Sequence, residues 1–312
     1  MGKIAYIFPG QGAQYVGMAM DFIQAYPEFE QILLDFDNKN GTELYKIMQE
    51  GPEEKLKETK FTQPAILFHS IVAMKAVQTE FTIKPDFVAG HSLGEFSALV
   101  ANGVLSFDDA MYLVHRRGEF MIKANEGKPF AMAAIIGPDA DTVKSICEEA
   151  SSAGIVIAAN FNTPVQTVIS GSKAGVEKAC ELLKEKGVKR IVPLVVGGPF
   201  HSPLIEKAGT WLAEEMRNIE FNETSIPVVA NVDAKFTTNP DKIRKNLEDQ
   251  VTSSVLWVDC IRHMIDEGVD IFIEFGPKKV LAGMLKKIDR NVKVISIDTV
   301  ETLYAVKEEL EF

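Results

Sequence analysis

Short apolar runs alternate with longer amphipathic segments along most of the chain. Residues 4–8 and 87–90 are apolar, and each run ends at a proline or a glycine, as strands buried on both faces do. A long apolar helix is predicted to start at Thr62-Gln63-Pro64, with the proline near its first turn. Other helices are predicted at about 18–60, 93–101 and 108–123. This alternation predicts an α/β fold with a mainly parallel sheet covered on both faces.

The order of predicted strands and helices changes between residues 128 and 197. Four strands and two helices are predicted there in the order βαββαβ, at 130–136, 139–151, 155–161, 166–170, 173–186 and 190–196. This is the order of a ferredoxin-like unit. We therefore predict a small ferredoxin-like subdomain at 128–197, inserted into a catalytic core made of 1–127 and 198–312. In the second part of that core, further elements are predicted at 204–217, 227–231, 255–267, 270–274 and 279–288.

Composition narrows the class of protein. The chain has 312 residues, of which 46% are hydrophobic and 25% charged, as in an ordinary globular enzyme. Its net charge of −11 argues against a nucleic-acid partner, because phosphates require a basic face. The three cysteines are too far apart for a metal or redox motif, which favours reduced thiols in the cytoplasm and no bound metal. We expect a monomer. We also expect no membrane span, since the longest charge-free stretch, 151–172, contains several amides and hydroxyls.

One motif indicates nucleophilic chemistry. Gly90-His91-Ser92-Leu93-Gly94 fits G-x-S-x-G, and it follows a predicted strand and precedes a predicted helix. Such a tight turn pushes the serine hydroxyl above the sheet edge and places the N–H of Leu93 where an oxyanion would form. The alternative, a glycine-rich turn that happens to contain serine, is disfavoured by this context. Ser92 is the predicted nucleophile.

Five histidines compete to be the base for Ser92. His69 lies in an apolar helix, and His115 and His263 lie in amphipathic ones, so a core or surface role is favoured for these three. His91 is adjacent to the nucleophile, and the turn is expected to point it elsewhere. His201 follows an apolar strand on a loop stiffened by two prolines, where functional groups concentrate. His201 is therefore the predicted base, and no acid is evident as a third member.

Two further segments allow alternative interpretations. Gly10-Gln11-Gly12 could begin a dinucleotide fingerprint, but Tyr15 stands where that motif needs glycine, so an oxyanion donor is favoured over a plain turn. Arg116-Arg117 could be a solvated basic pair. The alternative is that one guanidinium points inward and binds a substrate carboxylate through two hydrogen bonds.

Together these segments resemble the malonyl-CoA:acyl-carrier-protein transacylase family of fatty-acid synthesis. The matching blocks span nearly the whole chain: FPGQGAQ (8–14), TQPA (62–65), GHSLGEFSAL (90–99), RRG (116–118), GPFHS (198–202), NVDA (231–234), QVTSSVLW (250–257) and EFGPKKVL (274–281). The resemblance implies a hydrolase-like α/β core with a small ferredoxin-like insert. It also implies transfer of malonyl from malonyl-CoA to the phosphopantetheine thiol of acyl carrier protein, through a malonyl-serine ester and without a bound cofactor.

The resemblance also assigns roles to residues. Ser92 and His201 match the nucleophile and its partner, and Gln11 and Leu93 match the two backbone donors to the oxyanion. Arg117 matches the arginine that pairs with the malonyl carboxylate. The remaining matches are Gln250, whose main-chain carbonyl orients the histidine, and the channel-lining Asn160, Met121, Phe200 and Val280. The chain departs from the family pattern at Val165, Gly197, Ser254 and Lys278, which bears on the shape of the channel.

Other functions share these motifs. A serine hydrolase or thioesterase would use the same serine and histidine with water as acceptor, and a trans-acting acyltransferase of a polyketide pathway would differ only in its carrier. A non-catalytic carrier-binding module is a further alternative, which the presence of Ser92 and His201 disfavours. Since carrier proteins are acidic, docking is expected on a basic patch near Lys123, Lys128, Lys189 and Arg190.

Overall fold

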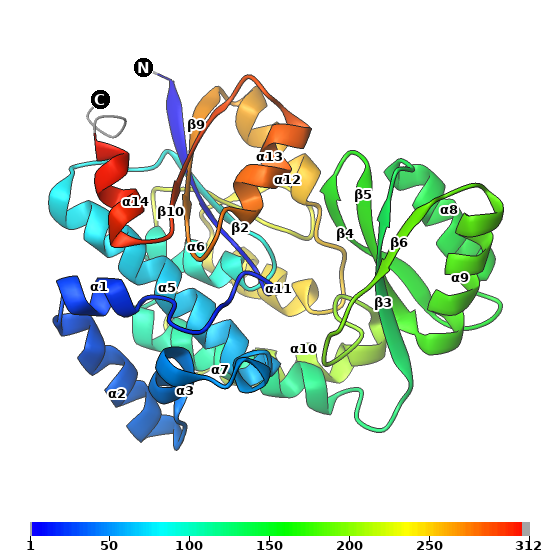
Figure 1. Ribbon diagram of the computed structural model, residues 1–312, viewed down its shortest axis with the longest axis horizontal. Coiled ribbons are helices and arrows are strands. Elements are labelled where there is room, and N and C mark those ends of the chain that lie inside the picture. The colour runs from blue at the N-terminus through cyan, green and yellow to red at the C-terminus, as the bar shows by residue number, and fades with distance from the viewer. Residues whose placement is uncertain (1, 308–312) are drawn as a thin grey trace.

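The molecule is built around two β-sheets. A computed structural model describes residues 2–307. Figure 1 shows a larger lobe around one sheet and a smaller lobe, drawn in green, around the other. The larger sheet has six strands, in the order β10 (Lys293–Ile297), β9 (Val269–Phe275), β1 (Lys3–Phe8), β2 (Phe87–Gly90), β7 (Val228–Val229) and β8 (Phe236–Thr237). All neighbouring pairs are parallel except β7 and β8, so the sheet is mixed.

The central strand β1 is apolar over most of its length because both faces of the sheet are covered. Ala5 and Ile7 pack in a core with residues of α12 (Trp257–Asp266) and α13 (Val280–Ile288). Tyr6 and Phe8 face the other way, into a core with α5 (Thr59–Glu80), α6 (Gly94–Ala101) and α7 (Phe107–Lys123). Side chains alternate across a strand, so an uninterrupted apolar run is what such a buried strand requires. The predicted α/β fold is confirmed.

The smaller lobe has the predicted element order. Its strands are β3 (Phe130–Ile136), β4 (Val156–Thr163), β5 (Gln166–Ser172) and β6 (Arg190–Pro193), paired antiparallel in the order β4-β5-β3-β6. Helices α8 (Ala140–Ala150) and α9 (Lys173–Glu185) cover one face, where Ala133 and Ile135 are buried. On the opposite face Met132 and Val168 pack into the core of the larger lobe. The sheet itself therefore forms a wall between its helices and that lobe.

A short backbone bridge joins the two lobes. Val255, just before α12, pairs with Asn160 of β4. The N–H of Phe161 donates to the carbonyl of Val255 at 3.0 Å, and the N–H of Val255 donates to the carbonyl of Ala159 at 2.8 Å. Because these bonds extend the small sheet onto the large lobe, they fix the position of one relative to the other.

The remaining helices lie in the larger lobe, and most of them pack on other helices. They are α1 (Met20–Ala25), α2 (Glu28–Asn40), α3 (Leu44–Glu50), α4 (Glu53–Leu56), α10 (Glu206–Met216), α11 (Pro240–Gln250) and α14 (Val300–Ala305), with a 3-10 turn at Pro203–Ile205. The elements α11, α14, β8 and β10 were not predicted. In α11 few positions are apolar, mainly Ile243 and Leu247, so its hydrophobic period is faint. Over the described residues, no helix is long and apolar enough to cross a bilayer.

The start of α5 differs from the prediction and explains a buried histidine. The helix begins at Thr59, so Pro64 lies inside it rather than in its first turn. Pro64 has no N–H to donate to the carbonyl of Lys60, four residues earlier. His115 of α7 supplies the missing donor, because its Nδ1 lies 3.0 Å from that carbonyl oxygen. The imidazole thus replaces a hydrogen bond that proline removes.

Replacing His115 with leucine is expected to lower the free energy of unfolding by about 1–2 kcal/mol, because the partly buried Lys60 carbonyl loses its donor. In a Pro64→Ala background the same change is expected to have a smaller effect, since the alanine would bring its own N–H to that carbonyl. Urea denaturation of the wild type, both single variants and the double variant measures this difference. An equal loss in both backgrounds would contradict the explanation.

Candidate active site

Ser92 sits in a tight turn between β2 and α6. Its φ of 54° lies in the left-handed region, which side chains rarely adopt. A Cβ on Gly90 would lie 1.8 Å from the backbone of Gly94, and one on Gly94 would lie 2.2 Å from the carbonyl oxygen of Phe8. Only glycine fits at these two positions. The turn therefore has the strained strand-to-helix geometry that G-x-S-x-G requires.

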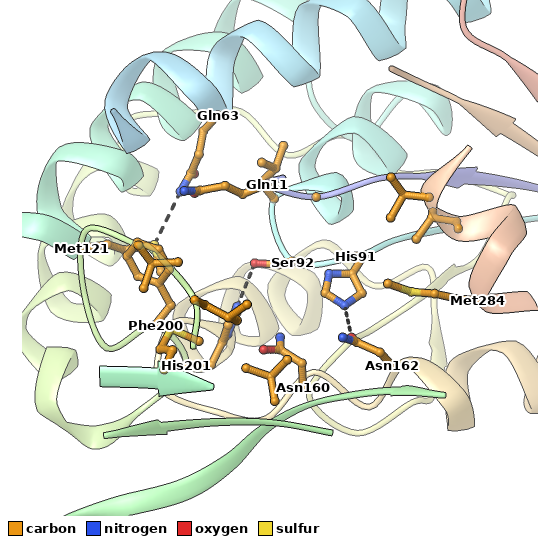
Figure 2. Close-up of a pocket in the computed structure, with 18 of the residues that line it drawn as sticks. Gln11, Gln63, His91, Ser92, Met121, Asn160, Asn162, Phe200, His201 and Met284 are labelled. Atoms are coloured by element: carbon orange, nitrogen blue, oxygen red, sulfur yellow. Dashed lines mark hydrogen bonds between the residues drawn. The ribbon is translucent and has the colours of Figure 1, made fainter. Parts of the chain in front are cut away.

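His201 is placed to accept the proton of Ser92. Its Nε2 lies 2.8 Å from Ser92 Oγ (Figure 2). Its Nδ1 lies 2.9 Å from the main-chain carbonyl oxygen of Gln250. The carbonyl can only accept, so Nδ1 carries the proton and Nε2 is left free to accept one. Burial, and then the positive charge of Arg117, lower the pKa of His201 to about 3. The imidazole is therefore a neutral base.

Asn231 holds the turn that carries Ser92, a role for which its sequence context offered no signal. The N–H of Ser92 donates to Asn231 Oδ1 at 2.7 Å, and Asn231 Nδ2 donates to the carbonyl of Gly90 at 2.7 Å. The side-chain amide thus binds both sides of the turn. Asparagine after a strand is common in turns, so only the contact between distant segments reveals this role.

Arg117 is the buried member of the arginine pair, with 1% of its surface exposed. Its Nη1 donates to Gln63 Oε1 at 2.8 Å, and its Nη2 donates to Gln250 Oε1 at 2.9 Å and to Ser92 Oγ at 3.1 Å. Arg116, by contrast, pairs with Glu119 and Glu215 nearer the surface. Arg117 thus points inward and Arg116 outward, as the second interpretation of the pair expects. That Arg117 binds a substrate carboxylate stays a prediction.

No carboxylate of the described residues forms an ion pair with Arg117. The charge that acts on its pKa is that of Glu95, which partly offsets the effect of burial. Burial nevertheless lowers the pKa of Arg117 to about 10. Isolated buried cations are unfavourable unless they are paired or hydrogen-bonded. The guanidinium next to Ser92 is therefore a strong site for an anionic group.

Gln11 and Leu93 are the two predicted backbone donors to an oxyanion. Both residues line the pocket around Ser92, and Leu93 directly precedes α6. Within residues 2–307 neither N–H has a hydrogen-bond acceptor. Two such donors near a nucleophile are suited to a developing oxyanion.

The pocket has a volume of about 190 Å³ and lies between the two lobes. The predicted channel residues Asn160, Met121, Phe200 and Val280 all line it. Gln250 does not, because it is buried behind Arg117 and His201. Lining residues that the sequence did not single out include Gln63, Met132, Asn162, Leu194, Val196 and Met284.

The other histidines are engaged elsewhere. His69, His115 and His263 each bond a backbone carbonyl, of Asp298, Lys60 and Ala234 respectively. His91 lines the pocket, but its ring points elsewhere than Ser92, as expected. Figure 2 shows its ring turned from Ser92 toward Asn162, and its Nε2 lies 2.8 Å from Asn162 Oδ1.

The departures from the family pattern leave this pocket intact. Ser254 donates its hydroxyl to the carbonyl of Ala158 at 2.7 Å, and Lys278 donates to the carbonyl of Gln14 at 3.2 Å. Val165 is exposed, and Gly197 lines a neighbouring groove. None of these four residues lines the pocket around Ser92. No cluster of three metal-ligating side chains occurs in the described part of the chain.

The expected basic patch is not one surface. Lys123 and Lys128 line the groove beside the pocket, together with Lys57 and Lys60; we call this the lysine groove. Lys189 and Arg190 lie elsewhere, because Arg190 pairs with Ile136 at the far end of β3, whereas Lys128 precedes the start of that strand. A seven-residue strand separates these ends by roughly 20 Å.

The chain is similar to known proteins over nearly its whole length. The acyl transferase domain family matches residues 5–303. The chain belongs to this family. A malonyl CoA-acyl carrier protein transacylase of Bacillus subtilis is 44% identical over 304 residues, which cover 97% of this chain and 96% of that protein. One of Haemophilus influenzae is 42% identical, with 99% of each chain covered.

Solved structures of family members have the same fold. An acyl-carrier-protein S-malonyltransferase from Burkholderia pseudomallei superposes with a TM-score of 0.94 at 42% identity, covering 99% of this chain and 100% of that one. A malonyl-transacylase in complex with a type II polyketide synthase acyl carrier protein has a TM-score of 0.94 at 37% identity, covering 98% of this chain and 99% of that one. The chain therefore spans the full length of these family members.

The low pKa of His201 has a measurable consequence. A neutral imidazole is the competent base, so a lowered pKa extends activity toward acid. We expect the rate at which an uncharged sulfonyl fluoride modifies Ser92 to show no fall centred on the ordinary histidine pKa of about 6.5. His201→Ala should lower that rate by about 10²-fold or more.

The matched control is Arg117→Gln. Removing the positive charge raises the pKa of His201, so the acid limb of the labelling rate should move to higher pH in this variant than in the wild type. The assignment would be contradicted if the labelling rate of the wild type fell with a midpoint near the ordinary histidine pKa of about 6.5, and if Arg117→Gln left that midpoint unchanged.

Proposed function

We propose that this chain transfers the malonyl group of malonyl-CoA to the phosphopantetheine thiol of acyl carrier protein in fatty-acid biosynthesis, through an ester on Ser92. One observation carries the proposal: a buried guanidinium without a carboxylate partner among the described residues lies 3.1 Å from the nucleophilic hydroxyl. A thioester whose acyl group ends in a carboxylate would supply the missing anion and bring its carbonyl to Ser92. The family relationship supports the same reaction.

In the first step Ser92 Oγ attacks the thioester carbonyl while His201 Nε2 takes its proton. The negative charge that develops on the carbonyl oxygen would be held by the N–H groups of Gln11 and Leu93. The C–S bond then breaks, and the thiolate of coenzyme A takes a proton from His201. A thiol of pKa about 8.5 is a good leaving group, so little acid assistance is needed. The product is a malonyl ester of Ser92.

In the second step the carrier thiol enters the same pocket. His201 removes its proton, the sulfur attacks the ester carbonyl, and the C–O bond to Ser92 breaks as His201 returns the proton. The carbonyl of Gln250 keeps the imidazole in one orientation and stabilises its charged form in both steps. Every proton moved in these two steps passes through His201, so the sequence of bond changes needs no bound cofactor.

Arg117 would select the acyl group. Its two Nη atoms already share one side of the pocket with Ser92, so a carboxylate bound there is fixed in two directions. Met121 and Phe200 line the same pocket and limit the space around the acyl chain. We assign Asn160 and Val280 to the walls of the channel for the pantetheine arm.

We further propose that residues 1–127 and 198–312 form a hydrolase-like catalytic core and that 128–197 form a ferredoxin-like subdomain. The element order and the antiparallel strand order β4-β5-β3-β6 support the second assignment. The strained turn between β2 and α6 supports the first. In this arrangement the small subdomain closes one side of the pocket and limits access of water.

The carrier protein would approach along the lysine groove, where five cationic side chains outnumber three carboxylates and so suit an acidic partner. Residues of this groove are adjacent in sequence to Met121 and Val196 of the pocket. A polyketide carrier is a second candidate, because a structural relative was solved with a type II polyketide synthase acyl carrier protein. We propose a cytoplasmic monomer without a nucleic-acid partner, consistent with the net charge of −11.

Intact mass spectrometry tests the function. Mixing the protein with malonyl-CoA should add one malonyl group, and adding a carrier protein with its phosphopantetheine arm should move that group to the carrier. Ser92→Ala should remain unlabelled. If the label is lost to water at the same rate without carrier, the chain is a hydrolase; if Ser92 is never acylated, the proposal fails.

Arg117→Ala tests the selection of the acyl group. Truncating one partner of a buried charge pair should lower kcat/KM for malonyl-CoA by roughly 10²-fold or more, while transfer of acetyl, which has no carboxylate, should fall less or improve. Steady-state rates with both thioesters measure this. An equal loss for the two substrates would remove Arg117 as the carboxylate partner.

A further inference from the structure

Glu95 is a buried carboxyl group that the mechanism above does not use. It lies in the first turn of α6, three residues after the nucleophile, and is 1% exposed. One oxygen, Oε2, accepts two hydrogen bonds, from the N–H of Asn231 at 3.0 Å and from Gln250 Nε2 at 2.9 Å. Burial raises the pKa of Glu95 to about 7, while these bonds and the charge of Arg117 lower it. A carboxyl held in this way needs an explanation.

The surroundings of the Gln250 amide have a strict polarity. Its Nε2 faces only acceptors: Glu95 Oε2, the carbonyl of Ser92 at 3.0 Å and Asn231 Oδ1 at 3.5 Å. Its Oε1 faces a donor, Arg117 Nη2, at 2.9 Å. Turning the amide over would set an NH₂ group against a guanidinium and an oxygen against three acceptors. The acceptors on one side therefore decide which atom meets Arg117 on the other.

This polarity leaves the charge of Arg117 available. The guanidinium is fixed by two neutral amide oxygens, from Gln63 and Gln250, and by no carboxylate among the described residues. A carboxylate in direct contact would fix it equally well but would compete with an anionic substrate. Glu95 instead acts on Arg117 through the side chain of Gln250, which lies between them. By accepting from Nε2 of this amide, Glu95 directs the amide oxygen at Arg117 without forming an ion pair with it.

We infer that Glu95 is a positioning residue for selection of the acyl carboxylate: it orients the side-chain amide of Gln250, and through it the guanidinium of Arg117. The identity of the selected acyl group rests on the proposed function. The backbone carbonyl of Gln250 serves His201 separately. Disturbing Glu95 should therefore change the preference between acyl groups beyond any change in overall activity.

The readout is the ratio of kcat/KM for acylation of Ser92 by malonyl-CoA to that by acetyl-CoA. Glu95→Met has similar length but no acceptor, so it should lower this ratio by about tenfold or more, the effect of a lost hydrogen bond to a charged group. Glu95→Gln keeps an oxygen that can take the place of Oε2, so it should hold the ratio within about threefold of the wild type. A purely structural role would lower both rates together and leave the ratio unchanged.

A double-variant cycle tests whether Glu95 acts through Gln250. Gln250→Met removes the amide but keeps the backbone carbonyl for His201, so it should lower the ratio about as much as Glu95→Met does. In the Gln250→Met background, adding Glu95→Met should not lower the ratio further. Three results would each overturn the inference. The two substitutions could have additive effects, the ratio could be unchanged in Glu95→Met, or the ratio in Glu95→Gln could be as low as in Glu95→Met.

Two controls separate other causes of failure. A wild type that is not acylated by malonyl-CoA would refute the proposed function, whereas a malonylated wild type with an unchanged ratio in the variants refutes only the role of Glu95. If Glu95→Met does not fold, Gln250→Met decides alone: an unchanged ratio in that variant overturns the inference, and a lowered ratio with wild-type behaviour of Glu95→Gln supports it.

Discussion

A buried positive charge without a carboxylate partner among the described residues is the constraint on which the site depends. Arg117 is almost fully enclosed, and its hydrogen bonds go to two amide oxygens and one hydroxyl. Neutral acceptors bind its two Nη atoms but do not neutralise the charge, and the buried Nε has no hydrogen-bond partner among the described residues. The guanidinium is therefore suited to binding an anion. One of these acceptors is the hydroxyl of Ser92, so an anionic acyl group held by Arg117 would lie beside the proposed nucleophile.

Three helices meet at this charge. Helix α7 carries Arg117, α5 supplies Gln63, and the last residue of α11 is Gln250, which serves two partners at once. Its side chain fixes Arg117, and its main-chain carbonyl fixes His201. In the proposed mechanism this dual role lets the base work without an acidic residue. A carboxylate in contact with His201 would also attract the guanidinium and cancel the charge that we propose binds the substrate.

Two of the five non-glycine residues with positive φ in the described part of the chain meet in this site. Ser92 and His201 both have positive φ, 54° and 58°, outside the range that side chains prefer. Distant segments stabilise both conformations, since Asn231 binds the turn of Ser92 and Gln250 binds the ring of His201. The short distance between the two reacting atoms is therefore a product of tertiary contacts rather than of either loop alone.

The sequence was sufficient for features that depend on local pattern. The buried run of β1, the turn at Ser92 and the element order of the small lobe all follow from periodicity and from glycine positions. It was insufficient where a role depends on contacts across the chain: Asn231, Glu95 and Gln63 carry ordinary polar side chains, and only their distances reveal their partners. Pro64 was placed in a first turn because nothing in its neighbourhood shows that His115 replaces its missing donor.

A crystal structure of the protein acylated on Ser92 by malonyl-CoA, in the absence of carrier, tests the central claim most directly. The account predicts that the free carboxylate of the ester lies within hydrogen-bond distance of both Nη atoms of Arg117, with the ester carbonyl directed at the N–H groups of Gln11 and Leu93. An ester whose carboxylate points to solvent or binds another cation, while Arg117 keeps only its amide contacts, would contradict it.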